Sequence, residues 1–489
     1  MANDYDVIVI GGGGAGMCAA IEACDAGARV LLIEAAKQLG GSTALSGGVY
    51  YAAGSSVQRA AGIAGDTPGA MFEYYLTLNQ HRVDPAVVRV LCDEAAPSLE
   101  WLIALGVEFR AQDLYVSGVE SVARGHQARG NGAAIAEALE RAVRARLAGE
   151  SETGQSSPQA QRAAGRSPAK SQGGIELALG NRVESLLFRD GAVRGVVARG
   201  EEASAASVVL ASGGFGQSAE LLARHYPEAT LSGDWAWCIS APTCVGDGLR
   251  MSQQVGASIG GENRGLLLTT PGFTKQLEAH VPGWLVYVNA DGRRFVDETA
   301  AYAVMSGVIR QNGGRCWAIF DEPARAEAKP SPELADAFAS GVIPLNWVAD
   351  VLAQEAAKGK IHRADSLEAL AKRAGIAPGA LASTVARYNA DCAAGRDAAF
   401  FKDGRLMRPV STPPFYAAEI RPAIVCLTSC GPRITPDARV LDQNERPIPG
   451  LYAAGEVTGN VLGERYVGGG NSIANAVVFG RVAGRGAAG

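Results

Sequence analysis

The sequence predicts an α/β fold built around a parallel sheet, and three observations support this. The first is a strand, glycine-rich turn, helix and strand near the start of the chain, expected at 6–10, 11–16, 17–26 and 29–33. The second is the composition, with 62 glycines and 47% apolar residues among 489, which suits an α/β protein of two or more domains. The third is a second glycine cluster, 468–470, followed by an apolar helical pattern. The first and last segments are therefore expected to share one domain.

The first βαβ unit has the features of a dinucleotide-binding site. Gly11 allows the tight turn, Gly13 lets a pyrophosphate approach the backbone, and Gly16 permits close packing of the helix on the strand. The N–H groups at the helix start can then hold the phosphates. Glu34 follows Gly16 by 18 residues and can accept hydrogen bonds from ribose hydroxyls. An acid at this position predicts FAD or NAD rather than NADP.

The loop after the second strand favours FAD over NAD. Residues 37–54 read KQLGGSTALSGGVYYAAG and are rich in glycine, serine and threonine. Such a loop can wrap backbone amides around a phosphate and a flavin ring. An enzyme that binds only NAD has no need of it.

Charge and cysteine usage narrow the class of protein. The net charge of −5 and the scattered basic residues give no reason to propose nucleic-acid binding. None of the nine cysteines forms a CxxC pair or has zinc spacing with histidine, so buried reduced thiols and no metal site are expected. The sequence shows no signal peptide and no apolar run long enough to span a bilayer, so a cytoplasmic protein without a transmembrane segment is expected.

The middle of the chain predicts helices, one low-complexity segment and an inserted domain. Within 66–105, Pro85 and Pro97 are each expected to begin a new helix, because proline is tolerated in a first turn. Residues 150–173 are rich in serine, glutamine, proline and glycine, which predicts a mobile surface loop without a catalytic role. From about 231 to 403 the pattern becomes mixed α+β, as expected for a cap inserted into the first domain.

Six motifs in order give the sequence a family resemblance. They are YDVIVIGGGGAG, IEAAKQLGGSTALSGG, ASGGFG, NADGRRFVDE, GLYAAGEVTG and GGGNSIANAVVFGRVAG. The chain resembles the fumarate reductase/3-ketosteroid dehydrogenase superfamily of FAD enzymes, and most of all the 3-ketosteroid Δ4-dehydrogenases. The resemblance implies a Rossmann-like FAD-binding domain of the GR2 type with an inserted α+β capping, catalytic domain. It places the FAD-binding domain at 1–230 and 406–489 and the capping domain at 231–405.

The resemblance also assigns residues to the cofactor. It implies contacts with the ADP half, then with the pyrophosphate, ribitol and ring, then with adenine, and finally with ribitol and the flavin edge. In that order the residues are Gly11, Gly13, Gly14, Ala15, Gly16 and Glu34; Gly41, Ser42, Thr43, Ser46, Gly47 and Gly48; Val183; Gly455, Glu456, Asn471, Ser472 and Ile473. Relatives that attach FAD covalently use a histidine in the loop after the second strand. The glycine, serine and threonine here imply noncovalent FAD.

Two departures argue against a dicarboxylate substrate. Fumarate reductases hold two carboxylates with arginines, which pair with them bidentately. Tyr302 stands where the arginine of the cap motif is expected, and Val467 where the arginine before the last G-G-N is expected. Arg294 and Arg465 remain nearby and could still act as anchors.

The replacements resemble the catalytic residues of 3-ketosteroid dehydrogenases. There, one cap tyrosine removes a proton next to a ketone, and a second tyrosine and a glycine amide four residues later hydrogen-bond the ketone oxygen. Tyr302 resembles the first, and Tyr466 and Gly470 resemble the pair. Tyr115 resembles a third tyrosine that links the base to solvent. Two donors on the oxygen would stabilise a developing enolate.

The resemblance therefore implies a 3-oxo steroid dehydrogenase that introduces a C=C bond next to the ketone, with Δ4 favoured over Δ1. An external electron acceptor is implied, and its identity stays open. One alternative is an ene-reductase or dehydrogenase of a small carboxylate, with Arg294 or Arg465 as its anchor. The other is a non-catalytic electron-transfer flavoprotein that uses the cap as a partner surface.

Overall fold

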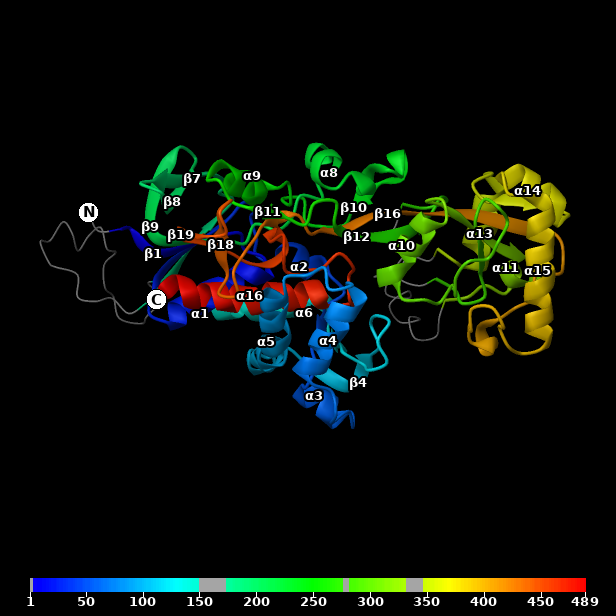
Figure 1. The fold of residues 1–489 in the computed structure, drawn as a ribbon, viewed down its shortest axis with the longest axis horizontal. Helices are drawn as coiled ribbons and strands as arrows, with labels where there is room; N and C mark the ends of the chain where they lie inside the picture. Colours follow the sequence, from blue (N-terminus) through cyan, green and yellow to red (C-terminus); the bar gives the residue numbers. More distant parts are fainter. Residues whose placement is uncertain (1–2, 149–172, 276–280, 331–345) are drawn as a thin grey trace, which may run out of the picture. The chain divides into compact units, whose positions relative to one another are not determined.

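The structure, a computed structural model (Figure 1), describes all residues except 1–2, 149–172, 276–280 and 331–345. The described residues form two compact units. Unit 1 comprises residues 1–227, 240–266 and 427–489, and unit 2 comprises residues 228–239 and 267–426. The predicted surface loop at 150–173 lies outside the described residues except for its last residue.

Unit 1 is built on an eight-stranded sheet with a parallel centre. The main path runs β18-β19-β9-β1-β2-β6, and β8 and β7 continue from β9. Neighbours from β19 to β6 are parallel, and Val7 lies opposite Val30 on one side and Ser207 on the other. The strands are β1 (Tyr5–Ile10), β2 (Arg29–Glu34), β6 (Gly174–Leu179), β7 (Val183–Arg189), β8 (Ala192–Ala198), β9 (Glu201–Leu210), β18 (Arg439–Leu441) and β19 (Pro447–Ala453). The expected α/β fold is confirmed.

Two helices, α1 (Gly14–Asp25) and α16 (Asn471–Ala488), pack on each other within this unit (Figure 1). Their backbones approach closely, because a Cβ on Gly480 would lie 2.5 Å from the carbonyl oxygen of Ala15. A Cβ on Gly484 would lie 2.4 Å from that of Ala19. The prediction that the first and last segments share a domain is thus explained by direct packing. The expected start of the first helix at 17 is wrong, since the helical backbone already begins within the glycine run.

The other elements of unit 1 surround these layers. The helices are α2 (Gly41–Leu45), α3 (Ser56–Ala60), α4 (Pro68–Leu78), α5 (Pro85–Ala104), α6 (Asn131–Arg144), α8 (Ala219–His225), α9 (Asp247–Gln254) and η5 (Gly455–Val457). The smaller sheets are β3 (Val49–Tyr51), β5 (Gly125–Ala128) and β4 (Phe109–Tyr115), and β11 (Ile259–Gly260) with β17 (Gly431–Pro432).

The expectation that Pro97 begins a helix is wrong, because α5 runs through it without a break. Proline in a helix interior removes one backbone hydrogen bond, so other contacts must hold the helix together. Tyr50 donates a hydrogen bond to the carbonyl of Ala95 at 3.0 Å. Arg481 of α16 donates to Ser98 Oγ at 3.0 Å. Tertiary packing therefore overrides the local preference of proline.

Unit 2 contains a six-stranded mixed sheet. β10 (Trp237–Cys238), β12 (Gly265–Pro271), β14 (Cys316–Asp321) and β15 (His362–Ala364) all pair with the long β16 (Phe415–Thr428), and β13 (Val286–Val288) pairs with β14. Its helices are η2 (Gly233–Trp235), α10 (Tyr302–Gln311), α11 (Glu322–Ala326), α13 (Ala349–Ala357), α14 (Leu367–Ala374), α15 (Pro378–Ala393) and η4 (Gly404–Leu406), while η1 (Pro227–Thr230) lies at the unit boundary. The buried cores around Phe320 and Leu381 belong to this unit alone.

The observed units differ from the predicted segments at residues 228–230, which fall in unit 2, and in two longer stretches. Residues 240–266 belong to unit 1, because β11 pairs with β17 there. Residues 406–426 belong to unit 2, because β16 pairs with β14 along its first half. Strand pairing between distant segments sets these boundaries, and composition alone does not reveal it.

Candidate functional site

The glycine-rich turn joins β1 to α1 at the carboxyl end of the parallel strands. Gly11 has a φ of 106°, in the left-handed region that favours glycine. A Cβ on Gly16 would lie only 1.8 Å from the carbonyl oxygen of Gly11. A Cβ on Gly13, in contrast, would meet nothing within 4 Å. The backbone conformation at Gly11 and the close packing at Gly16 therefore require glycine, whereas Gly13 leaves one side of the backbone open.

A second backbone segment runs beside this turn. Gly40 forms a parallel bridge with Gly13, and its N–H donates to the carbonyl of Gly12 at 2.9 Å. The N–H of Gly14 donates to Thr43 Oγ1 at 3.2 Å. The N-cap residue Gly13 provides no side-chain cap for α1, so Thr43 supplies the side-chain acceptor for the first N–H, and the backbone around the helix start is rich in glycine. We call the region formed by Gly11–Gly16 and Gly40–Thr43 the glycine cradle, and it fits a pyrophosphate.

Glu34 is fixed at the end of β2 beside the glycine cradle. Its Oε2 accepts a hydrogen bond from the N–H of Gly12 and its Oε1 from that of Ala36, both at 2.6 Å. Its backbone carbonyl accepts from the N–H of Asn181 at 2.9 Å, which leads into β7 at Val183. The carboxylate thus also closes the glycine turn. Its contact with ribose, and that of Val183 with adenine, stay predictions.

The loop after β2 uses its hydroxyl groups partly for its own structure. Ser42 Oγ accepts a hydrogen bond from the N–H of Ala241 at 3.0 Å and lies 3.4 Å from Cys244 Sγ. Ser46 Oγ donates to the carbonyl of Thr43 at 2.8 Å. The segment 241–244 therefore braces the cradle, and no local sequence signal marks it. The predicted flavin contacts of this loop, including Gly41, Gly47 and Gly48, stay predictions.

Glu456 is partly buried within unit 1, in the short helix η5 of the GLYAAGEVTG motif. Burial raises the pKa of its carboxyl group to about 6, although hydrogen bonds from Thr428 act in the opposite direction. The Oε1 atom accepts from the N–H of Thr428 at 3.0 Å and from its Oγ1 at 3.2 Å. A Cβ on Gly214 would lie 2.2 Å from the same oxygen, so the carboxyl group fills the space beside the ASGGFG motif. The predicted ribitol contacts of Gly455 and Glu456 stay predictions.

Tyr466 is bound to the first turn of α16. The N–H of Ser472 donates to its phenolic oxygen at 3.0 Å, and Ser472 Oγ lies 3.1 Å from that oxygen. Gly470 precedes the helix with a φ of 94°, and a Cβ there would lie 2.7 Å from the backbone of β3. Asn471 accepts a hydrogen bond from Tyr75, so its side chain is held in the core. The structure thus brings Tyr466, Gly470 and Ser472 together at one helix start.

The remaining predicted tyrosines belong to separate units. Tyr115 lies on β4 in unit 1, and burial together with Glu120 raises its pKa to about 12. Tyr302 is the first residue of α10 in unit 2 and is 43% exposed. The predicted relay from Tyr302 through Tyr115 stays a prediction.

Arg294 is held in a buried charge network of unit 2. Its guanidinium donates to both oxygens of Glu298 at 2.8 and 2.9 Å and lies 2.7 Å from Asp397. Lys402 also contacts Glu298 at 3.0 Å. Burial opposes the charge on Arg294, but its bonds to both carboxylates outweigh this effect and raise its pKa. Only 6% of the Arg294 side chain is exposed. The arginine that the sequence offered as a possible substrate anchor is therefore already bonded to buried carboxylates.

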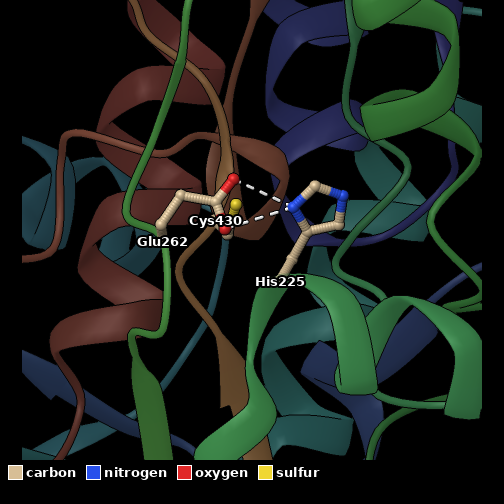
Figure 2. Close-up of side chains that lie close together, drawn as sticks. All are labelled: His225, Glu262 and Cys430. Carbon is tan, nitrogen blue, oxygen red and sulfur yellow. Dashed lines mark hydrogen bonds and ion pairs between the residues drawn. The ribbon is translucent and has the colours of Figure 1, made fainter.

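A further polar group in unit 1 joins His225, Glu262 and Cys430 (Figure 2). His225 Nδ1 lies 2.9 Å from one oxygen of Glu262 and 3.2 Å from the other. Burial and the neighbouring carboxylate raise the pKa of Cys430 to about 12. The three ligand atoms lie within 4.8 Å of one another, a donor set that zinc accepts, but Glu262 already pairs with His225 and hydrogen-bonds Cys430. We interpret the group as a brace between three chain segments.

Comparisons with known proteins follow the same fold. The chain matches the family model described as FAD binding domain over residues 6–473. It is 32% identical over 500 residues to fumarate reductase (cytochrome) of Shewanella frigidimarina, covering 99% of this chain and 77% of that protein. It is 30% identical over 521 residues to digoxin reductase of Eggerthella lenta, covering 99% and 86%. A solved structure of 3-ketosteroid-Δ4-(5α)-dehydrogenase from Rhodococcus jostii RHA1, in complex with 4-androstene-3,17-dione, has a TM-score of 0.74 at 25% identity and covers 100% and 98%.

The fold and the glycine cradle thus define an FAD-dependent oxidoreductase that acts on CH–CH groups. The chain belongs to the FAD-binding family that includes the fumarate reductases. The expectation of FAD is confirmed, and the open space beside Gly13 is compatible with a pyrophosphate in the cradle. The relatives are named for different substrates, so membership does not fix the substrate. Among the described residues, no helix combines the length and apolar character needed to cross a bilayer.

Proposed function

We propose that the protein dehydrogenates a ring ketone next to its carbonyl group, with a 3-oxo steroid as substrate and Δ4 favoured over Δ1. The observation that carries the proposal is the placement of Tyr466 at the start of α16. The shared fold with the Rhodococcus jostii dehydrogenase supports it. FAD, when bound, supplies the acceptor for the hydride that leaves the substrate.

Tyr466 and Gly470 are suited to hold a ketone oxygen. A phenol that accepts a hydrogen bond from a backbone N–H becomes a stronger donor, because hydrogen bonds in a chain polarise one another. Ser472 supplies that N–H at 3.0 Å and fixes the ring. The positive end of the helix dipole adds a favourable field for negative charge. In this proposal both donors stabilise the charge that develops on the oxygen as the α-proton leaves.

Tyr302 is the proposed base for the α-proton. It begins the ten-residue helix α10, where the helix dipole favours a negative phenolate. In our proposal its hydroxyl oxygen takes the proton from the carbon next to the ketone. The β-hydrogen leaves as hydride, so the substrate loses two electrons and two hydrogens and gains one C=C bond.

The buried network around Arg294 supports a ketone over a dicarboxylate. An arginine that already pairs with Glu298 and Asp397 cannot also chelate a substrate carboxylate without giving up these buried ion pairs. Tyr302 and Val467 occupy the two positions where arginines are expected in fumarate reductases. These three sites together weaken the dicarboxylate reading.

A second candidate is a reductase of a small unsaturated carboxylate. The 32% identity to a fumarate reductase over nearly the whole chain favours it. Arg465 is then the anchor, since its side chain is exposed beside the proposed oxyanion donors. This candidate requires turnover with fumarate or acrylate as oxidant and a dependence on Arg465.

Steady-state kinetics of three forms separates the two candidates. With a 3-oxo-5α-steroid and a dye acceptor, Tyr302→Phe should lower kcat by about 10²-fold or more, the scale for loss of a general base. Arg465→Gln should leave that activity within twofold. If the wild type instead reduces fumarate with a reduced dye, and Arg465→Gln abolishes this reaction, the carboxylate candidate replaces the ketone proposal.

A further inference from the structure

Unit 1 contains a cavity of about 510 Å³ whose lining residues lie outside the glycine cradle. This volume is within the range of about 300–1,000 Å³ that small-molecule sites occupy. Arg82, Arg264 and Arg433 line the cavity, and Asp84 is the acidic residue among its lining residues. The lining therefore carries an excess of positive charge, although the chain as a whole has a net charge of −5.

Arg264 is the arginine with a guanidinium that is not engaged elsewhere. In the part of the chain that the structure describes, its side chain has neither an ion-pair nor a hydrogen-bond partner. It is nevertheless only partly exposed. A half-buried guanidinium has five donors and is weakly hydrated, so a bidentate anion is its natural partner.

The turn that carries Arg264 is held rigidly. The N–H of Arg264 donates to the carbonyl of Gly261 at 3.1 Å, and its own carbonyl accepts from the N–H of Ser429 at 3.0 Å. The N–H of Asn263 donates to the carbonyl of His225 at 2.8 Å, and the side chain of Glu262 meets the ring of the same histidine (Figure 2). These bonds fix the backbone beneath Arg264, so little order has to be gained when a ligand binds.

The other two arginines are held by weak, exposed pairs. Arg82 contacts Glu464 at 3.2 Å, with side chains 64% and 42% exposed. Arg433 pairs with Glu445, whose side chain is 58% exposed. Exposed ion pairs contribute little stability, so both arginines can be recruited by a ligand at low cost.

Asp84 does not cancel this charge. Its Oδ1 accepts from the N–H of Val87 as the N-cap of α5, and its Oδ2 accepts from Asn460 at 3.0 Å. The carboxylate also lies 4.0 Å from Arg433. Asp84 is thus fixed at the edge of the cavity, and its role there is to cap the helix and orient one arginine.

We infer that this cavity is a binding site for a small anion with two or more negative charges on phosphate or carboxylate groups. Arg264 is the main contact, because its guanidinium is not paired, and Arg82 and Arg433 add positive charge to the same lining. None of its lining residues is among the FAD and substrate contacts proposed above, so we assign the site to an anionic ligand other than FAD and the ketone.

Isothermal titration of the FAD-loaded protein tests the inference. The probes are inorganic pyrophosphate, which carries phosphate groups, and citrate, which carries carboxylates. The protein is loaded with FAD so that the probes cannot bind in the glycine cradle. The variants are Arg264→Gln and, as a matched control, Arg439→Gln, which removes the same charge from an exposed arginine paired with Asp437. Both should keep the flavin spectrum and melting temperature of the wild type.

At low ionic strength, at least one probe should bind with one site, and Arg264→Gln should weaken it by about 10- to 100-fold, the loss of a charged hydrogen bond. Arg439→Gln should bind as the wild type does, and binding should weaken with salt. Preference for pyrophosphate identifies a phosphate ligand, and preference for citrate a carboxylate. No binding of either probe to the wild type at millimolar concentration, or equal weakening by both variants, overturns the inference.

Discussion

The starts of α1 and α16 both have a glycine at the N-cap position within unit 1, but their surroundings differ. At α1 the neighbouring positions are glycines, and an added Cβ at Gly13 would meet open space. At α16 the phenol of Tyr466 lies on the first turn and accepts the N–H of Ser472. The first helix end has open space beside Gly13 and one N–H bound to Thr43 Oγ1, and the second carries a positioned phenol.

This difference shows how one physical device, the positive end of a helix, can serve two tasks. An end with open space beside it suits a ligand that brings its own negative charge, such as a pyrophosphate. An end that carries a phenol suits a neutral ligand on which charge develops during reaction, because the donor is already oriented. The ketone proposal rests on this reading of α16, and the following variants are designed to break or sharpen it.

The largest effect should come from glycines at the start of α1. Gly16→Ala places a Cβ against the carbonyl of Gly11 and should lower the free energy of unfolding by about 3 kcal/mol. Gly13→Ala meets no atom, so its apoprotein should unfold within about 0.5 kcal/mol of the wild type. Its FAD affinity should nevertheless fall by about tenfold or more, because the methyl group blocks the pyrophosphate.

Thermal unfolding of the apoproteins and titration with FAD measure these two effects separately. Unchanged FAD affinity in Gly13→Ala would show that the cradle does not hold the pyrophosphate.

Removal of the Tyr466 hydroxyl group beside α16 is the next test. Tyr466→Phe should lower kcat with a 3-oxo steroid by about 10²-fold, the scale for one oxyanion donor. FAD affinity should stay unchanged, because the tyrosine acts on the substrate in this account. Rapid kinetics of flavin reduction gives the value, and near-normal reduction would remove Tyr466 from the mechanism.

Glu456 provides a pH test of the region between the two helices. Its pKa is raised by burial to about 6, so the folded state binds its proton more tightly than the unfolded state. The protonated carboxyl group of Glu456 therefore adds stability at low pH. This stabilisation, about 2 kcal/mol in all, is lost as the pH rises through the range from about 4.5 to 6. Relative to the wild type, Glu456→Gln should gain about this much stability between pH 4.5 and pH 7.

Urea unfolding of both proteins at the two pH values, at saturating FAD, measures this difference. Glu184→Gln, at an exposed position, serves as the control and should show no such trend. Parallel pH profiles for Glu456→Gln and the wild type would contradict the assignment.

The smallest effect is expected for the hydroxyl of Ser472. Ser472→Ala keeps the backbone N–H but removes the Oγ next to Tyr466, which should lower kcat about fivefold, or about 1 kcal/mol. If the serine acts through the tyrosine, the double variant with Tyr466→Phe should be no slower than Tyr466→Phe alone. Additive losses in the double variant would show that Ser472 has a separate role.

Local patterns predicted the fold and the cofactor because both depend on short-range rules. The strand alternation, the glycine spacing and the acid at Glu34 all lie within one βαβ unit. The same patterns gave the wrong start for α1 and an incorrect break at Pro97. At Pro97, contacts from Tyr50 and from Arg481 of α16 hold the helix, and α16 is hundreds of residues away in sequence.

From the sequence, site residues could be predicted only where they lie within or next to a recognisable motif. Tyr466 and Gly470 could be found because they stand before the last helix motif. The brace of Ser42 by Ala241 and Cys244 could not be found, since no local signal marks that segment. The network that occupies Arg294 was also missed, because it depends on Asp397 from a distant turn. Long-range contacts of this kind follow from tertiary packing.

The central claim is that this member of the family acts on a ring ketone, and anaerobic flavin reduction tests it most directly. The oxidised, FAD-loaded protein is mixed separately with a saturated 3-oxo-5α-steroid, with its Δ4 counterpart and with succinate. The account predicts bleaching of the flavin band by the saturated steroid, with the Δ4 product identified afterwards. Bleaching by the Δ4 steroid would instead indicate Δ1 chemistry. Bleaching by succinate alone, or by none of the three, would contradict the ketone proposal.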